Sequence, residues 1–461
     1  MALGGGNFTT MDKALPGVYV NAQSTGLASA DNSNRGIVAL PMVMKWGAED
    51  KIVTITKDEL ASDGFASYKY FGYAYSADEM KPIRDIFQGA TKLLLYRADD
   101  NAAKATFTVA ADSATTTADT DGTTTDSTKE NEGSTKATKT LGTVKYAGSR
   151  GNDISVIVDN SAHEAITYFG TTKVDTYAYD GNLSKLENDY VSLDLSTVTP
   201  ETLVTYQASG GTDGSVTTES LTAFTELLES YAYNILCCPF TSADTQQTLI
   251  KYTIRARENL GLNSQIVVIG SGGSVTHGEA VIELVSEQAN ALYWVAGQLA
   301  GATVGTSLSG TEYGGEGEIT GNYSNSKLEQ FVKAGQFVIH NVNGTLRVLK
   351  DINTLTEYTE TKSKLFASND TIRTIDQISN DVGVVFAKYV YGKVRNNDTG
   401  RELLRNDISD VLDEIAETGA IEKVDFGSIA VSYVDKNAVS VTVPIVLVGA
   451  IEQIYITIAV S

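Results

Sequence analysis

The end of the chain, Val439–Ser461, constrains the fold most, because its apolar residues must be placed in a sheet. It reads VSVTVPIVLVGAIEQIYITIAVS and contains two runs in which every second residue is apolar. An apolar residue at every second position is the period of a β-strand. Gly449-Ala450 separates the runs as a turn or short connection. The alternating residues are Val439, Val441 and Val443 in the first run, and Ile454, Ile456, Ile458 and Val460 in the second.

Two β-rich runs at the end of a chain allow two interpretations. They form a terminal hairpin that closes the chain's own sheet, or one strand is shared with a neighbouring copy. An unpaired edge invites such an addition, because its N–H and C=O groups have no partner. The two runs by themselves leave both interpretations open.

Composition predicts a multidomain protein that does not enter a membrane. The length of 461 residues corresponds to about three domains, and a hydrophobic content of 42% allows proper cores. The N-terminus has neither the basic nor the apolar region of a signal peptide. The longest apolar run, Val443–Ile451, is far below the roughly 20 residues that span a bilayer. We therefore expect a soluble protein made in a cytoplasm.

The charge and the cysteines exclude further classes of function. A formal charge of −22 argues against contact with a nucleic-acid backbone, which requires clustered Lys and Arg. Cys237 and Cys238 are adjacent within an apolar run, where a disulfide between them would be badly strained. We expect both to be buried thiols with a structural role.

The pattern along the chain predicts an α/β (α+β) multidomain fold. Residues 112–140 are almost pure Thr, Ser, Asp, Lys and Gly, which indicates a long surface loop. From about residue 218, strand-like and helix-like segments alternate, which implies crossover units and a partly parallel sheet. The predicted divisions are an N-terminal arm (1–23), a first core segment (24–97), an inserted β-rich outer domain (98–215), a second core segment (216–438) and a C-terminal arm (439–461).

Three segments carry specific expectations. Residues 278–299 are predicted to form one long, largely apolar helix, and Asn343-Gly344 a tight hairpin turn. Residues 401–418 are predicted to be a helix with an apolar and an acidic face. The acidic face is either solvated or an electrostatic docking surface for a partner; it carries Asp407, Asp410, Asp413, Glu414 and Glu417.

No motif predicts catalysis, a cofactor or a metal site. Gly270–Gly273 follows an expected strand, but the segment matches neither G-x-G-x-x-G nor the P-loop. The three histidines lie far apart in the sequence, and no G-x-S-x-G elbow occurs. An α/β enzyme that uses the Gly270–Gly273 turn remains a rival hypothesis, which nucleotide binding would support.

Several stretches, in this order, resemble contractile phage tail sheath proteins of Gram-positive phages and phage-tail-like particles. Each is weak alone, and together they extend over nearly the whole chain. They are LPGVYV (15–20), RGIVALP (35–41), LLLYR (93–97), GSRGNDI (148–154), EAVIELVSEQANALYWVAGQLAGA (279–302) and DINTL (351–355).

The resemblance implies a structural protein, not an enzyme, in a virion tail or tail-like particle assembled in the bacterial cytoplasm. It implies hexameric rings that stack helically around an inner tail tube protein, with a baseplate and a tail terminator as further partners. It also implies that subunits exchange strands through an N-terminal arm, here Gly17, Val18, Tyr19 and Val20, and through the C-terminal arm. The alternative is a non-contractile surface or adhesin protein, for which a secretion signal would be expected.

Overall fold

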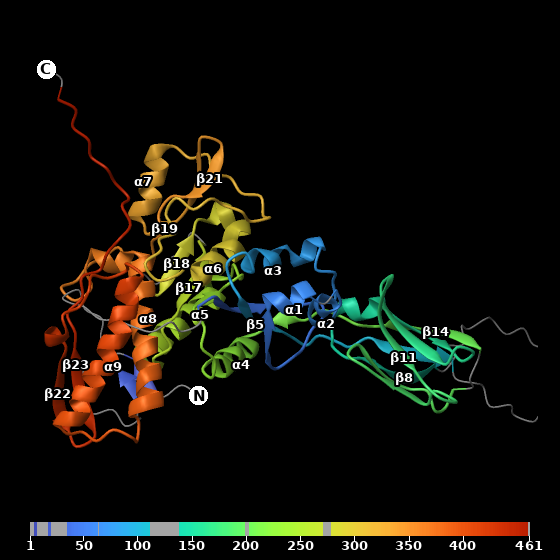
Figure 1. Cartoon of the computed structure of the whole chain (residues 1–461). Coiled ribbons are helices and arrows are strands. Elements are labelled where there is room, and N and C mark those ends of the chain that lie inside the picture. Colours follow the sequence, from blue (N-terminus) through green and yellow to red (C-terminus); the bar gives the residue numbers. More distant parts are fainter. Residues whose placement is uncertain are drawn as a thin grey trace, which may run out of the picture.

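A seven-stranded sheet forms the centre of the molecule, with strand order β19-β18-β17-β16-β3-β5-β4 (Figure 1). All neighbouring strands are parallel except β4, which is antiparallel to β5. The strands are β3 (Ile37–Met42), β4 (Ile52–Thr56), β5 (Lys92–Arg97), β16 (Ile235–Cys237), β17 (Gln265–Ile269), β18 (Val281–Leu284) and β19 (Gln336–Phe337). The computed structural model describes residues 4–6, 17–19, 35–62, 64–110, 138–198, 202–270 and 278–459. Strands β3 to β5 precede the segment that forms the second sheet, and strands β16 to β19 follow it, so the α/β core is discontinuous in sequence. The predicted mixed α/β fold class is confirmed.

Helices cover both faces of this sheet, because successive strand residues point to opposite sides. Leu93 and Leu95 pack with α3 (Lys81–Ile86) and α6 (Leu292–Gly301). Leu94 and Tyr96 pack with α4 (Thr218–Leu228) and α5 (Ala243–Arg255). The predicted buried thiols divide in the same way, with Cys237 in the first cluster and Cys238 in the second.

The contact between α3 and α6 requires glycine. A Cβ at Gly297 would lie 2.2 Å from the carbonyl oxygen of Ile86, so any side chain would force the two helices apart.

The remaining short helices are α1 (Lys57–Ser62), α2 (Ala66–Phe71), η1 (Asp78–Met80), η2 (Ser149–Asp153), η4 (Ser286–Ala291), η5 (Lys364–Ala367), η7 (Phe426–Ser428) and the π-type turns η3 (Ala256–Leu260) and η6 (Phe386–Val390).

The expected long helix over 278–299 is wrong. Val281–Leu284 is the buried strand β18, and the α-helix begins only at Leu292. A short apolar run has no periodicity that separates a buried strand from a buried helix. Here the β-branched Val281 and Ile282 fit between β17 and β19, where every residue of the strand is buried.

A second sheet of eight antiparallel strands projects to one side of the core (Figure 1). Its order is β11-β10-β9-β14-β7-β8-β13-β12, and Phe107, Val156 and Leu193 belong to a core of its own. The amide nitrogen of Asn188, next to β12, donates to Asp175 of β11 at 2.7 Å, so the two ends of the sheet approach each other. The strands are β7 (Thr106–Ala110), β8 (Thr138–Val144), β9 (Ile154–Asp159), β10 (Glu164–Phe169), β11 (Thr172–Ala178), β12 (Lys185–Glu187), β13 (Val191–Asp194) and β14 (Leu203–Ser209). Most of the predicted low-complexity loop, residues 111–137, lies outside the described residues.

The neck between the two sheets is buried and highly connected. Strands β6 (Asp99–Asp100) and β15 (Ser215–Val216) pair there. The fully buried Arg97 guanidinium donates to the Asp99 carboxylate at 2.7 and 3.0 Å and to the Ala147 carbonyl at 2.7 Å. The Trp46 ring, also fully buried, meets Phe169 of the second sheet edge-on at 5.2 Å between centroids.

The C-terminal region contains α8 (Asn369–Val385), α9 (Asp398–Glu417), β22 (Ala430–Asp435) and β23 (Ala438–Thr442), seen at the left of Figure 1. The predicted helix with one apolar face is confirmed in α9, whose five expected apolar residues are all buried: Leu404, Ile408, Val411, Leu412 and Ile415. The predicted hairpin is also confirmed, since β20 (Ile339–Val342) and β21 (Thr345–Val348) are joined by Asn343 and Gly344, both with positive φ. Helix α7 (Asn325–Lys333) lies near this hairpin.

Helix α8 buries charged as well as apolar side chains. The Arg373 guanidinium donates to Asp351 at 2.8 Å, and Arg257 reaches Asp376 at 2.6 Å. A buried ion has to be paired, because losing water is costly. These pairs therefore attach α8 to the loop at 351 and to the π-type turn η3 that follows α5.

Candidate assembly interface

The two runs of the terminal stretch have different environments. Strand β23 pairs antiparallel with β22 of the same chain, with Val439 opposite Tyr433 and Val441 opposite Val431. Val439 and Val443 pack partly against the core of the C-terminal region, and Val441 is 38% exposed. Beyond them, the backbone of Val446 and Val448 bonds to residues 422 and 420, at 2.9 Å each. The first run is therefore built into its own subunit.

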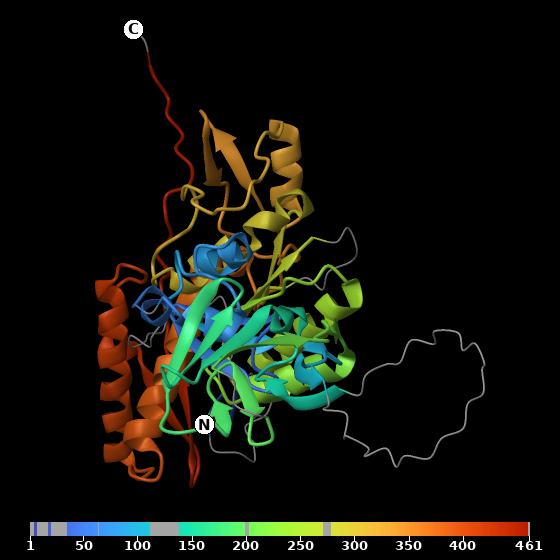
Figure 2. The same ribbon diagram turned by 90° about the vertical axis from the view of Figure 1, so that its right-hand side faces the viewer.

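The second run leaves the body of the molecule, as both views show (Figures 1 and 2). Residues 451–459 form no strand with any other described segment of the chain. The large apolar and aromatic side chains of this segment are mostly exposed, at 77% for Ile454, 88% for Tyr455, 78% for Ile456 and 81% for Ile458. A hairpin between the two runs is thus not formed by residues 439–459; Val460 lies outside the described residues. Exposed apolar side chains in a β pattern and unpaired backbone groups are features that favour pairing with another chain.

The small β22–β23 sheet consists of two strands, each with one outer edge. Within the described chain each strand pairs only with the other, and a two-stranded sheet is marginal without packing. Helix α9 supplies that packing on one face through Ile408 and Leu412, which share a core with Val431. The outer backbone edges of β22 and β23 have no further strand partner among the described residues.

The predicted N-terminal strand residues, Gly17 to Val20, lie partly outside the described residues. Gly17–Tyr19 forms β2, which pairs in parallel with β1 (Gly4–Gly6) in a separate two-stranded sheet. β2 lies beside α8, and Val20 is outside the described residues. The N-terminal and C-terminal segments therefore both reach the C-terminal region of the molecule.

The acidic residues of α9 lie along its outer side. Asp410, Glu414 and Glu417 are exposed, whereas Asp407 and Asp413 are half-buried. Partial burial, and secondarily the charge of Asp410, raises the pKa of Asp407. The Lys423 ammonium lies 3.6 Å from Asp413, so some of this charge is already compensated within the subunit.

The rival enzyme hypothesis gains no support from the described residues. Gly270 is followed, after residues 271–277 that lie outside the described segments, by the strand β18 rather than by a helix whose N-terminus would bind phosphate. No group of three or more metal-ligating side chains occurs among the described residues. None of the helices described is long and apolar enough to cross a bilayer.

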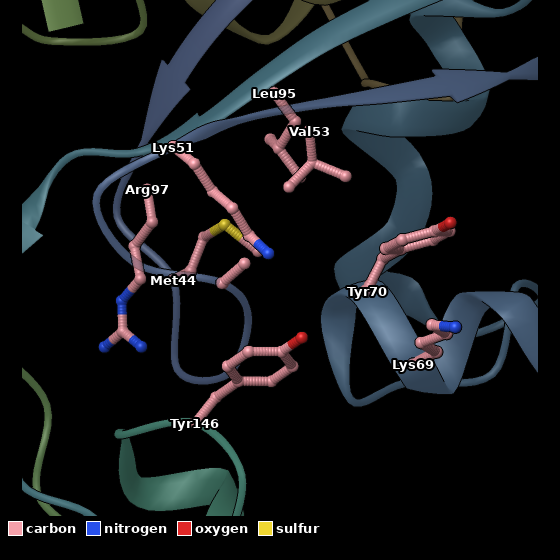
Figure 3. A pocket seen from close by; sticks show the side chains of 9 residues that line it. Met44, Lys51, Val53, Lys69, Tyr70, Leu95, Arg97 and Tyr146 are labelled. Carbon is pink, nitrogen blue, oxygen red and sulfur yellow. The ribbon is translucent and has the colours of Figure 1, made fainter. Parts of the chain in front are cut away.

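A cavity of about 120 Å³ lies beside the neck, lined among others by Met44, Lys51, Lys69, Arg97 and Tyr146 (Figure 3). Typical ligand pockets measure about 300–1,000 Å³. Two of its cations are already paired, Lys69 with Asp189 at 2.8 Å and Arg97 with Asp99. We therefore do not regard this cavity as a candidate binding site.

The fold is a discontinuous α/β core with an attached β-sheet domain and a terminal segment that pairs with no other described part of the chain. Three family descriptions match: Tail sheath protein Gp18 domain III N-terminal region at residues 35–98, Phage tail sheath protein central domain at 214–354, and Phage tail sheath C-terminal domain at 361–461. The chain belongs to the contractile tail sheath proteins. This family is a structural one, which favours the sheath over the surface-protein alternative.

Individual relatives agree with this assignment. The phage-like element PBSX protein XkdK of Bacillus subtilis is 27% identical over 415 residues, covering 82% of this chain and 81% of XkdK. The crystal structure of a sheath tail protein from Desulfitobacterium hafniense matches with a TM-score of 0.73 and 25% identity, covering 95% of this chain and 99% of that one. The contracted helical sheath of the anti-feeding prophage shares the fold, at a TM-score of 0.54 and 11% identity over 97% of this chain and 99% of that one.

Proposed function

We propose that the chain polymerises as hexameric rings stacked helically around an inner tail tube, and that the polymer contracts to drive the tube through a target envelope. A baseplate and a tail terminator bound the polymer at its two ends. Assembly takes place in the bacterial cytoplasm, and the finished subunit resides in the tail of a virion or tail-like particle. The protein has no catalytic role, and the energy of contraction is stored during assembly.

Strand exchange connects the subunits in this proposal. Of the predicted C-terminal arm (439–461), only residues 449–461, named the arm from here on, cross to a neighbour. They add to an open edge of its β22–β23 sheet, and Gly17–Val20 contributes a second connection. The observation that carries the proposal is the exposure of Ile454, Ile456 and Ile458, each of them 77–81% exposed. Burying such a side chain contributes about 1.5–3 kcal/mol, and each new backbone hydrogen bond about 0.5–1.5 kcal/mol.

In this arrangement, the second sheet and helix α9 also have defined positions. Residues 98–215 form the outer domain, carried on the core of residues 24–97 and 216–438. The acidic side of α9 faces the inner tube, and its exposed Asp410, Glu414 and Glu417 would then meet a basic tube surface.

Truncation tests the proposal directly. We expect the chain ending at Val448 to remain folded, with an unchanged unfolding transition, and to form no tubes or rings in electron micrographs. A full-length Thr457→Ser chain serves as the matched control, since it keeps the arm and its apolar face. Tube formation by the truncated chain at the concentration that suffices for the full chain would refute strand exchange at this end.

A further inference from the structure

One acidic residue holds the base of the arm where it leaves the body. The Glu452 carboxylate lies 2.8 Å from the Lys350 ammonium and accepts a hydrogen bond from the Ser309 hydroxyl, also at 2.8 Å. The Lys350 and Glu452 side chains are 35% and 29% exposed, so the pair is partly shielded from water. From Ile454 onward, the apolar and aromatic side chains are largely exposed.

The two residues that hold Glu452 belong to a rigid platform. The Ser309 hydroxyl also accepts from the Asp351 backbone N–H at 3.0 Å, next to Lys350 in the chain. The fully buried Asp351 carboxylate accepts from Arg373 of α8 at 2.8 Å and from the Leu308 N–H at 3.1 Å. The arm is thus connected through Ser309 and Asp351 to α8, which packs within the body.

The position of Glu452 determines which side chains of the arm lie on the same face as the contact with Lys350 and Ser309. In an extended chain, side chains two residues apart share a face. Glu452 therefore lies on the same face as Ile454, Ile456 and Ile458, and Tyr455 and Thr457 lie on the other. A shift of one residue would exchange the two faces.

We infer that Lys350 and Ser309 clamp Glu452 and thereby set the rotation of the arm about its own axis, so that the isoleucine face meets the neighbouring subunit. Glu452 is a positioning residue for assembly and not the source of its binding energy, which comes from the isoleucines. This inference rests on the proposed strand exchange.

Charge reversal and charge exchange test the clamp. We expect Lys350→Glu and Glu452→Lys each to slow tube formation, followed by light scattering at low salt, by about fivefold or more. The double variant restores the rate, because the pair is rebuilt with opposite polarity. Arg347→Glu is the matched control, because Arg347, which lies in β21 shortly before Lys350, pairs with Glu312 at 3.2 Å and not with the arm. Single reversals that assemble like this control, or a double variant that is no better than the singles, overturn the inference.

Insertions separate rotation from simple attachment. One Ala inserted after Glu452 moves the isoleucines to the opposite face, and two inserted Ala residues restore the original face with a longer arm. We expect the single insertion to block tube formation and the double insertion to recover it to a lower level than the parent chain. Equal effects of the two insertions would overturn the inference. The chain that ends at Val448 is tested beside every variant. If this truncated chain assembles normally, the proposed strand exchange is refuted. If it does not assemble, strand exchange stands, and the variants test only the contact of Glu452 with Lys350 and Ser309.

Discussion

The neck to the second sheet and the exit of the C-terminal arm are two junctions of opposite construction. At the neck, the side chains of Arg97 and Asp99 are fully buried and bonded to each other, and the Trp46 ring packs edge-on against Tyr146 and Phe169. At the arm exit, a single partly exposed pair, Lys350 and Glu452, precedes a segment that contacts little of its own chain.

The difference indicates which regions move together. A buried junction with satisfied polar groups has to break several interactions at once to bend, so the second sheet should follow the core as one body. Bending at the arm exit requires only that the screened Lys350–Glu452 ion pair and the hydrogen bond from Ser309 to Glu452 break. In a contracting polymer, we therefore expect bending at residues 449–453 and not at the neck.

Asp99→Asn should have the largest effect, because it removes the closer of the two carboxylates that compensate the buried Arg97, leaving the partly exposed Glu49 at 3.4 Å. Breaking one partner of a buried ion pair costs about 3–5 kcal/mol. We expect a decrease of that size in the free energy of unfolding, measured by urea denaturation. Asp78→Asn, at an exposed carboxylate paired with Lys81, is the control and should change stability by less than about 0.5 kcal/mol. Similar values for both variants would show that the neck is not the rigid junction described above.

Ile421→Val should have an intermediate effect, confined to the anchored half of the terminal stretch. Ile421 is 2% exposed and forms a β-bridge with Leu447, just before the arm begins. Deleting one buried methyl group from Ile costs about 0.5–1.5 kcal/mol. Hydrogen exchange should then be faster in residues 420–448 and unchanged at the neck. An equal acceleration in both regions would mean that the two junctions unfold as one unit.

Local patterns predicted the elements whose packing depends on their own sequence. The apolar residues of α9 recur at helical spacing, and Asn343-Gly344 supplies the two positive φ angles that its turn requires. In α8, Ile372, Ile378 and Val385 also recur at helical spacing, and all three are buried. Tyr389 is 53% exposed, because the chain leaves the α-helix after Val385 and continues through the π-type turn η6.

Interactions between distant residues were not predictable from local patterns. Arg257 and Asp376 are 119 residues apart, and Arg373 pairs with Asp351 across a loop, so no periodicity indicates either pair. The same holds for Lys350 and Glu452. The sequence left open whether the two terminal runs pair with each other or whether one is shared with another copy. The structure distinguishes the runs: residues 439–448 bond within their own subunit, and residues 451–459 leave its body.

Ile456→Thr should have the smallest effect on the isolated subunit and a large effect on assembly. The Ile456 side chain is 78% exposed, so its replacement by a polar residue that also favours strands should change the free energy of unfolding by less than about 0.5 kcal/mol. Tube formation should nevertheless require a higher protein concentration, because the side chain would be buried only between subunits. Urea denaturation and sedimentation of tubes measure the two quantities on the same sample. If Ile456→Thr destabilised the monomer as much as Ile421→Val does, the arm would pack on its own subunit, and the contrast between the two junctions would fail.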